Sequence, residues 1–189
     1  MIKEFVLKNR SYRRFYQNEQ VSKEILIELV DLARLSASLA NKQPLKYIIS
    51  NTEDKNAKIF PYLAWAGYLE AWLGPKQGER PAAYIIILGD KKISSSFGCD
   101  QGIASQSILL GATEKGLGGC IIGTVKQEAL AKSLSIDDNF DILLVIALGK
   151  PKEQVIINQV GDNGDIKYWR DHNDVHHVPK RNLEDILLK

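Results

Sequence analysis

The sequence predicts a single domain, covering residues 1–189, in which helices and strands are mixed. Residues 82–88 are a nearly continuous run of β-branched and aromatic side chains, and residues 140–148 form a second apolar run. Such runs are typical of strands buried on both faces. Residues 22–36 instead repeat apolar side chains at the i, i+3 and i+4 spacing of an amphipathic helix. A chain of this length can bury one sizeable core.

The composition argues against several classes of protein. Hydrophobic residues make up 44% and charged residues 25% of the chain, which is ordinary for a globular protein and argues against disorder. A net charge of +2, with acidic and basic residues interleaved, is too mild for a nucleic-acid partner. Cys99 and Cys120 stand alone, so we expect reduced thiols. With no visible apolar leader and no apolar run of membrane length, we expect a cytoplasmic protein without a membrane partner.

The first third of the chain predicts two helices and a strand. Residues 2–8 predict a short helix, and Ser22 is a suitable N-cap for the amphipathic helix that follows it. A loop of small and amide side chains then leads to Pro44, which is expected to hold Gln43 in an extended conformation. Residues 45–50 predict a strand.

Residues 53–72 predict two short helices broken at Pro61. In the second of these helices, Trp65 and Trp72 would be seven residues apart and would share one face. We interpret this face as core or interface packing rather than as a stacking site for a cofactor.

The remainder of the chain predicts one long helix and a poorly structured tail. A helix is expected from Asp100 to about Lys115, and its interior glycines indicate close approach by another backbone, in a central or intersubunit position. Residues 116–123 predict a strand and residues 126–134 a short helix. Residues 150–189 show no clear elements, which is better explained if this tail wraps around a second subunit.

Residues 9–15, with the sequence Asn-Arg-Ser-Tyr-Arg-Arg-Phe, are the most distinctive polar segment. The guanidinium group binds phosphate or carboxylate oxygens two at a time, so three arginines beside a serine hydroxyl suit a phosphorylated cofactor. A solvated basic turn is the alternative, because charged clusters usually face water. Taken alone, the segment favours the basic turn.

Other motifs of enzymatic chemistry are lacking in the sequence. The spacing GxGGxxxG over residues 116–123 does not match the dinucleotide fingerprint. His172, His176 and His177 lack the helical pattern that would bring them onto one metal ion, so we expect no metal site and interpret them as solvated or intersubunit histidines. Since no acid, base or nucleophile constellation is visible, we expect no catalytic side chain and chemistry supplied by a bound cofactor.

Four segments, in the right order along nearly the whole chain, resemble motifs of the nitroreductase family of flavin enzymes. Residues 10–15 look like its N-terminal RSxRxF motif, and residues 33–44 resemble its AxxAPSxxNxQPW segment. Residues 100–123 are similar to its long central helix and the GLG strand that follows. Residues 176–181 look like its C-terminal VPKR segment.

The resemblance implies an α+β fold, with a central mixed β-sheet flanked by helices, in a homodimer whose C-terminal tail is swapped onto the partner subunit. It also implies that FMN binds at the dimer interface. Electrons from NAD(P)H would pass through flavin N5 to an electron-poor small-molecule acceptor, such as a nitroaromatic or a quinone, in a ping-pong cycle. Two alternatives stay open, namely a flavin-binding redox sensor or carrier without robust turnover, and ring cleavage like that of flavin monooxygenases.

The resemblance assigns the arginine-rich segment and the tail to two parts of the flavin. Arg10 and Ser11 would contact the phosphate and the ribityl chain, and Lys180 and Arg181 would close on the phosphate. Arg13 would lie near the pyrimidine edge of the ring, where a cation stabilises the negative charge of the reduced flavin.

The remaining flavin contacts implied by the resemblance come from two other segments. Ser38, Leu39 and Asn41 would approach from the partner subunit, through backbone groups and the Asn amide. Ile122 and Gly123 would lie over one face of the ring, which leaves the other face open to nicotinamide and acceptor in turn.

The sequence also departs from the family pattern. Asn9 stands where many members have a further arginine, Ala37 replaces the usual proline, and Leu45 replaces the usual tryptophan. The family's pyrimidine-edge contacts from the middle of the chain have no clear match, and we expect residues 65–80 to replace them. Arg14 is expected to be solvated.

Overall fold

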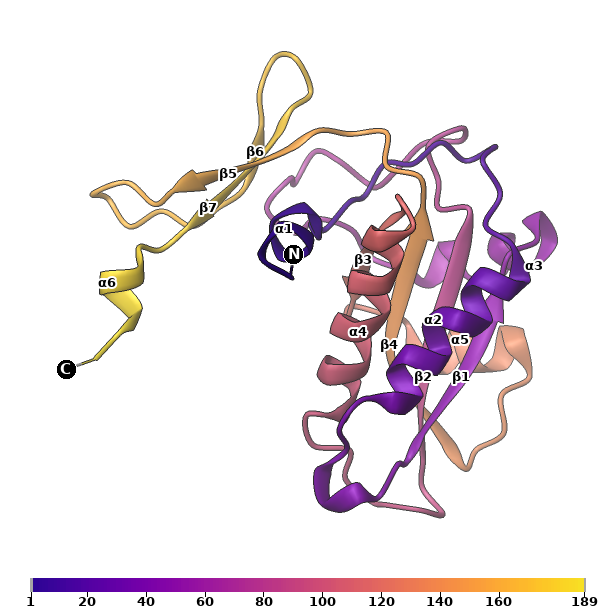
Figure 1. Ribbon diagram of the computed structural model, residues 1–189. Helices are drawn as coiled ribbons and strands as arrows, with labels where there is room; N and C mark the ends of the chain where they lie inside the picture. The colour runs from indigo at the N-terminus through magenta and orange to yellow at the C-terminus, as the bar shows by residue number, and fades with distance from the viewer. Residues whose placement is uncertain (1, 189) are drawn as a thin grey trace.

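The fold is built on an antiparallel sheet of four strands, which lies behind two long helices in the view of the computed structural model; the structure describes residues 2–188 (Figure 1). The spatial order is β1, β2, β4, β3, and each neighbouring pair is antiparallel. The central strand β2 is buried along its whole length, as its apolar sequence predicts. The strand bounds are β1 Leu45–Ser50, β2 Ala83–Asp90, β3 Gly118–Ile122 and β4 Phe140–Gly149.

Helices cover both faces of this sheet. α2 (Lys23–Leu35) and α4 (Asp100–Glu114) lie side by side on one face, whereas α5 (Gln127–Leu134) packs on the other (Figure 1). The Ser22 hydroxyl accepts a hydrogen bond from the Ile25 amide, which confirms the predicted N-cap. A Cβ on Gly111 of α4 would come within 2.3 Å of the Leu32 side chain. The glycine therefore lets α2 approach α4, and the prediction of a central helix is confirmed.

The arginine-rich segment, residues 9–15, is extended and meets the free edge of β3 through one isolated bridge. It follows the short helix α1 (Ile2–Lys8), whose prediction is confirmed. Ser11 forms a parallel bridge with Gly119, and the Tyr12 amide donates to the Gly119 carbonyl over 3.0 Å. A Cβ on Gly118 would lie 2.4 Å from the Tyr12 ring, so glycine at this position permits the close pairing.

Two local predictions are wrong. Residues 53–72 form α3 (Glu53–Ala57) and a 3-10 turn at Phe60–Tyr62, but no second helix. Instead, the Ala64 amide donates to the Thr124 carbonyl, and this pairing with the stretch after β3 competes with helix formation. Gln43 has φ of +51° rather than an extended backbone, because its amide turns back to donate to the Ser38 hydroxyl.

The packing role predicted for the two tryptophans is confirmed, although no helix carries them. Trp65 is 9% exposed and belongs to the core cluster between the sheet and α5. Trp72 packs against the same cluster, and the Arg170 guanidinium lies 4.2 Å from the centroid of its ring.

The tail has more secondary structure than its sequence predicts. Strands β5 (Val155–Gln159), β6 (Trp169–Arg170) and β7 (His176–Lys180) form a second sheet in the order β5-β7-β6, and α6 (Leu183–Ile186) follows. β5 pairs with β7 in parallel, and β6 pairs with β7 antiparallel. The strands are too short for their patterns to stand out in the sequence.

The far part of the tail projects from the body of the molecule (Figure 1). It leaves a group of large apolar side chains exposed to solvent, which is unusual outside a binding surface. These are Ile156, Ile157, Ile166, Trp169, Leu183, Ile186, Leu187 and Leu188.

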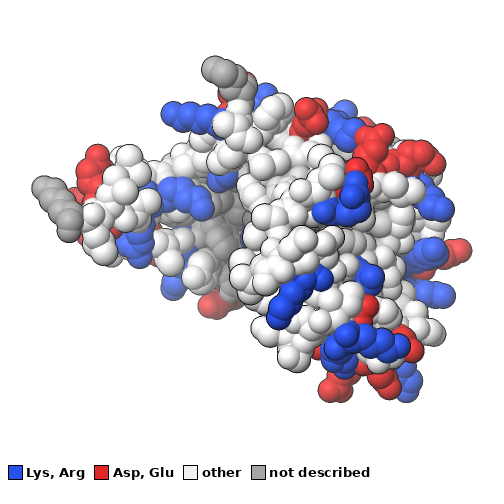
Figure 2. Space-filling view, turned by 60° about the horizontal axis from the view of Figure 1, so that its bottom comes forward, with Lys and Arg blue, Asp and Glu red and all other residues white. Residues whose placement is uncertain are grey.

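Charged side chains of both signs are interspersed on the face seen in Figure 2, consistent with the small net charge of +2. None of the helices within residues 2–188 combines the length and the apolar character needed to cross a bilayer.

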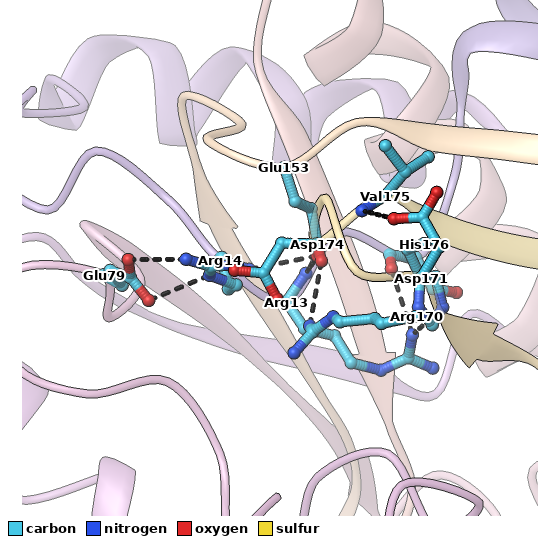
Figure 3. Close-up of polar contacts among 10 residues, drawn as sticks. Arg13, Arg14, Glu79, Glu153, Arg170, Asp171, Asp174, Val175 and His176 are labelled. Carbon is cyan, nitrogen blue, oxygen red and sulfur yellow. Dashed lines mark hydrogen bonds and ion pairs between the residues drawn. The ribbon is translucent and has the colours of Figure 1, made fainter.

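The arginine-rich segment is anchored by a nearly buried carboxylate. Glu79, which is 5% exposed, accepts hydrogen bonds from Arg14 Nε and Nη2 over 2.9 and 2.8 Å (Figure 3). Lys152 Nζ lies 3.1 Å from the same carboxylate, and Arg14 also pairs with Asp174 over 3.2 Å. The expectation that Arg14 is solvated is therefore wrong, since its side chain is only 17% exposed.

The Arg14–Glu79 contact predicts a pH-dependent contribution to stability. Hydrogen bonding from Arg14 lowers the pKa of Glu79 to about 2, so the stabilisation is present above the ordinary carboxyl pKa of about 4.5 and is lost as the pH falls towards 2. At pH 7 we expect Glu79→Gln to reduce the free energy of unfolding by about 1–3 kcal/mol, because Arg14 loses a charged partner.

Urea unfolding of both proteins at several pH values measures this difference, which is expected to shrink steadily below about pH 4.5. The control is Glu128→Gln, a change at an exposed glutamate of α5, with an expected effect within about 0.5 kcal/mol. A difference between Glu79→Gln and the parent protein that is the same at pH 7 and pH 3 would contradict the role of the ion pair.

Candidate functional site

A cavity of about 260 Å³ lies beside Arg13 at the end of β3. It is lined by Arg13, by the loop of residues 64–67 and by residues 120–124. A second cavity, of about 480 Å³, shares residues 64–67 and Thr124 with the first and is walled by aromatic and aliphatic side chains. We call the two adjoining cavities the recess: Arg13 lines the smaller one, and Glu70 and Lys126 stand among the aromatic and aliphatic side chains of the larger one.

The Arg13 side chain is held at this recess by three contacts. Its Nη1 donates to the Ser11 carbonyl over 3.2 Å and lies 3.2 Å from Nε2 of His176. The guanidinium carbon lies 4.8 Å from the centroid of the Tyr168 ring, within the range of a cation–π contact. No carboxylate pairs with the Arg13 side chain among the described residues. Its charge is thus positioned and not neutralised.

Glu153 holds the backbone of the same segment through its carboxylate (Figure 3). Its side chain is fully buried and accepts hydrogen bonds from the backbone amides of Arg13 and Arg14. Arg170 Nη2 donates to its other oxygen over 2.9 Å. A buried carboxylate is costly unless it is paired and hydrogen-bonded, and here both requirements are met.

His176 is buried against Arg13 within a single chain. The interpretation of the three histidines as solvated or intersubunit residues is therefore wrong for His176. Burial, together with the nearby positive charges of Arg13 and Arg170, lowers the pKa of His176 to about 4. The ring is therefore neutral at pH 7 and its Nε2 can accept a hydrogen bond from Arg13. His177 lies 3.3 Å from Asp171, and His172 is exposed.

Arg10 lies three residues before Arg13 and has a donor without a partner. Its Nη2 donates to the Val6 carbonyl over 2.7 Å, while its Nε is buried and has no partner. Burial lowers the pKa of Arg10, as expected for a cation without a carboxylate nearby. Ser11, between them, is exposed. Arg10, Ser11 and Arg13 thus lie in one extended segment, in which the Arg13 side chain contacts the Ser11 carbonyl.

The predicted residues of β3 also reach this recess. Ile122 and Gly123 both line the smaller cavity. The Ile122 side chain is 4% exposed and packs in the core, whereas Ile121 is 40% exposed and also lines the cavity. Alternation along the strand could have indicated Ile121, since neighbouring side chains point to opposite faces.

The loop before β1 lies apart from this recess within one chain. Figure 1 shows the connection between α2 and β1 at the lower end of the molecule, away from α1. There the Ser38 hydroxyl and the Leu39 amide both donate to Asp100, over 2.6 and 2.9 Å. Asn41 is exposed, in a left-handed conformation with φ of +53°.

Lys180 and Arg181, at the end of β7, are exposed and form no ion pair among the described residues. Of the ten predicted residues, Arg13, Ile122 and Gly123 line the recess within one chain, Arg10 and Ser11 lie in the same segment as Arg13, and the other five lie elsewhere. Glu153, Tyr168 and His176 contact the arginine-rich segment but were missed by the sequence-based prediction, which had no local pattern to indicate them.

Comparisons with known proteins agree with this fold. The model of the nitroreductase family matches residues 6–150. A protein of Archaeoglobus fulgidus, provisionally named NADH dehydrogenase/NAD(P)H nitroreductase, is 27% identical over 149 residues, covering 75% of this chain and 80% of its own. An FMN-dependent nitroreductase structure from Clostridium difficile R20291 has a TM-score of 0.64 and 23% identity, with 82% of this chain and 89% of that chain covered.

A nitroreductase family structure from Streptococcus pneumoniae TIGR4 covers 100% of both chains with a TM-score of 0.72 at 17% identity, so its fold extends through the tail. The family match spans residues 6–150, well over half of the sequence. This chain belongs to the nitroreductase family.

Proposed function

We propose that the protein is an FMN-dependent oxidoreductase that passes electrons from NAD(P)H to an electron-poor small-molecule acceptor. Membership of a family of flavin enzymes supports the proposal. The provisional name of the Archaeoglobus relative supports NAD(P)H as electron donor, and the Clostridium difficile structure of the same fold is described as FMN-dependent.

The observation that carries the proposal is a pair of arginines without carboxylate partners in the segment that reaches the recess, of which Arg13 lines the smaller cavity. Among residues 2–188, Arg14, Arg34 and Arg170 form ion pairs with carboxylates. Arg10 and Arg13 do not, although both are half-buried and Arg10 has an orphaned Nε. A phosphorylated, electron-accepting ligand would supply the missing negative charge. The residues present therefore fit FMN.

In this proposal Arg10 and Ser11 bind the phosphate and the ribityl chain, and Lys180 and Arg181 approach the phosphate from the tail. Arg13 lies at the pyrimidine edge of the ring. Neutral His176 keeps the Arg13 guanidinium oriented without adding a second positive charge. When bound, the flavin supplies the hydride chemistry between NAD(P)H and the acceptor, so no side chain of the chain is required as a catalytic acid or base.

The site is proposed to need two subunits. Ser38, Leu39 and Asn41 lie away from the recess in one chain, and the exposed apolar side chains of the tail have nothing to cover them. We propose a homodimer in which residues 1–189 form one domain per subunit and residues 150–189 wrap around the partner. The loop of one subunit would then complete the flavin site of the other. Ile122 and Gly123 would lie beneath the ring.

The proposal predicts a yellow protein with the visible absorption bands of oxidised flavin. Anaerobic addition of NADH or NADPH should bleach these bands, and an electron-poor acceptor such as a quinone should restore them. Absorption spectroscopy on the purified protein, with FMN added where needed, makes this measurement. Flavin colour that reduced nicotinamide leaves unchanged would favour a binding protein without robust turnover. A protein that takes up no FMN would contradict both functions.

Replacement of Arg10 by alanine is predicted to weaken FMN binding by about 1.5–3 kcal/mol, roughly 10- to 150-fold in Kd, because a charge-assisted hydrogen bond is lost. Quenching of flavin fluorescence on titration measures the Kd. The matched control is Arg34→Ala, which removes an exposed arginine of α2 that pairs with Asp31. Equal flavin affinity in the Arg10 and Arg34 variants would remove Arg10 from the phosphate site.

A further inference from the structure

A larger cavity, of about 610 Å³, lies elsewhere in the molecule, between α3 and the loop of residues 77–82. This volume is within the range of small-molecule sites in proteins. None of the residues that line it also lines the recess beside Arg13. Phe60 lines this larger cavity and Trp65 lines the recess, and the centroids of the two rings are 5.9 Å apart. The cavity is thus separate from the proposed flavin site.

Arg80 brings an un-neutralised positive charge into this cavity. Its guanidinium carbon lies 4.2 Å from the centroid of the Phe60 ring, and its Nε is buried without a hydrogen-bond partner. No ion pair includes Arg80 among the described residues, and the proposed flavin site has no role for it. Burying an arginine N–H without a hydrogen-bond acceptor is unfavourable, and an anionic ligand would supply that acceptor.

The position of Arg80 is fixed by its neighbours. The amides of Gly78 and Arg80 both donate to Gln17 Oε1, over 2.8 and 3.3 Å. Glu79, between them, is held on Arg14. The Arg80 side chain is therefore presented on a rigid turn, which reduces the entropy cost of binding a ligand.

The rest of the cavity wall is polar. Asn18, Gln20 and Gln77 line it, and their side chains make no hydrogen bond within residues 2–188. Glu53, at the start of α3, contributes an exposed carboxylate without an ion pair. The cavity thus combines one free cation, one free anion and several free amides.

We propose that this cavity binds a small organic zwitterion of the amino-acid type. The ligand's carboxylate pairs with Arg80, its ammonium group lies towards Glu53, and its polar body contacts the amide side chains. Arginine can hold a carboxylate through two parallel hydrogen bonds, which gives orientation as well as affinity. Binding is non-covalent and independent of the flavin.

The test is amide NMR on the full-length protein, with its cofactor as purified, titrated with L-glutamine and with L-glutaminamide, which lacks the carboxylate. L-Glutamine is expected to cause saturable shifts at Gly78, Arg80 and Asn51, and L-glutaminamide to bind at least tenfold more weakly. Shifts that do not saturate, that lie outside the cavity, or that are equal for the two probes would overturn the proposal. This comparison of two ligands uses the unsubstituted protein alone.

A pair of variants sharpens the test. Arg80→Gln is expected to weaken L-glutamine binding at least tenfold, while Arg34→Gln, at an exposed arginine on α2, leaves it unchanged. An Arg80→Gln protein that keeps the wild-type amide spectrum and the wild-type affinity would overturn the assignment. Flavin absorption measured on the same samples separates a failure of this site from a failure of the proposed function.

Discussion

The site depends on one constraint, which is that an extended segment carrying three arginines must lie against the edge of β3. Two carboxylates with little or no exposure make this possible. Glu153 accepts hydrogen bonds from the backbone amides of Arg13 and Arg14, and Glu79 neutralises the Arg14 side chain. With these charges satisfied, Arg13 lines the recess without a carboxylate partner, and Arg10, three residues earlier, keeps a buried Nε without a hydrogen-bond partner. The same segment in solvent would have been only a basic turn.

The constraint also links distant parts of the chain. Glu153 and His176 lie in the tail, yet both contact Arg13, which is 140 residues before Glu153 and 163 before His176. Arg170 completes the charge balance by pairing with Glu153 and stacking on Trp72 of the loop after α3. The tail is thus part of the electrostatics of the site. Its exposed apolar side chains are the surface that the proposed second subunit would cover.

The sequence predicted helices and strands correctly where a single local pattern, such as an apolar run or an N-cap residue, determines the structure. The buried strand β2 and the Ser22 cap of α2 follow directly from side-chain type and spacing. The helix predicted after Pro61 failed because Ala64 pairs with Thr124, a competitor 60 residues away that no local window contains. The arginines of the site were found through a motif. Glu153 and His176 were missed because a lone glutamate and a lone histidine show no periodicity that marks them as buried partners.

A crystal structure of the protein grown with FMN tests the central claim most directly. The account predicts the phosphate within hydrogen-bonding distance of Arg10, and the ring over residues 121–123 with its pyrimidine edge at Arg13. It also predicts that a second subunit contributes the loop of residues 38–41. A flavin bound with its phosphate away from Arg10 and its ring away from Arg13, or no flavin in the recess at saturating concentration, would contradict the account.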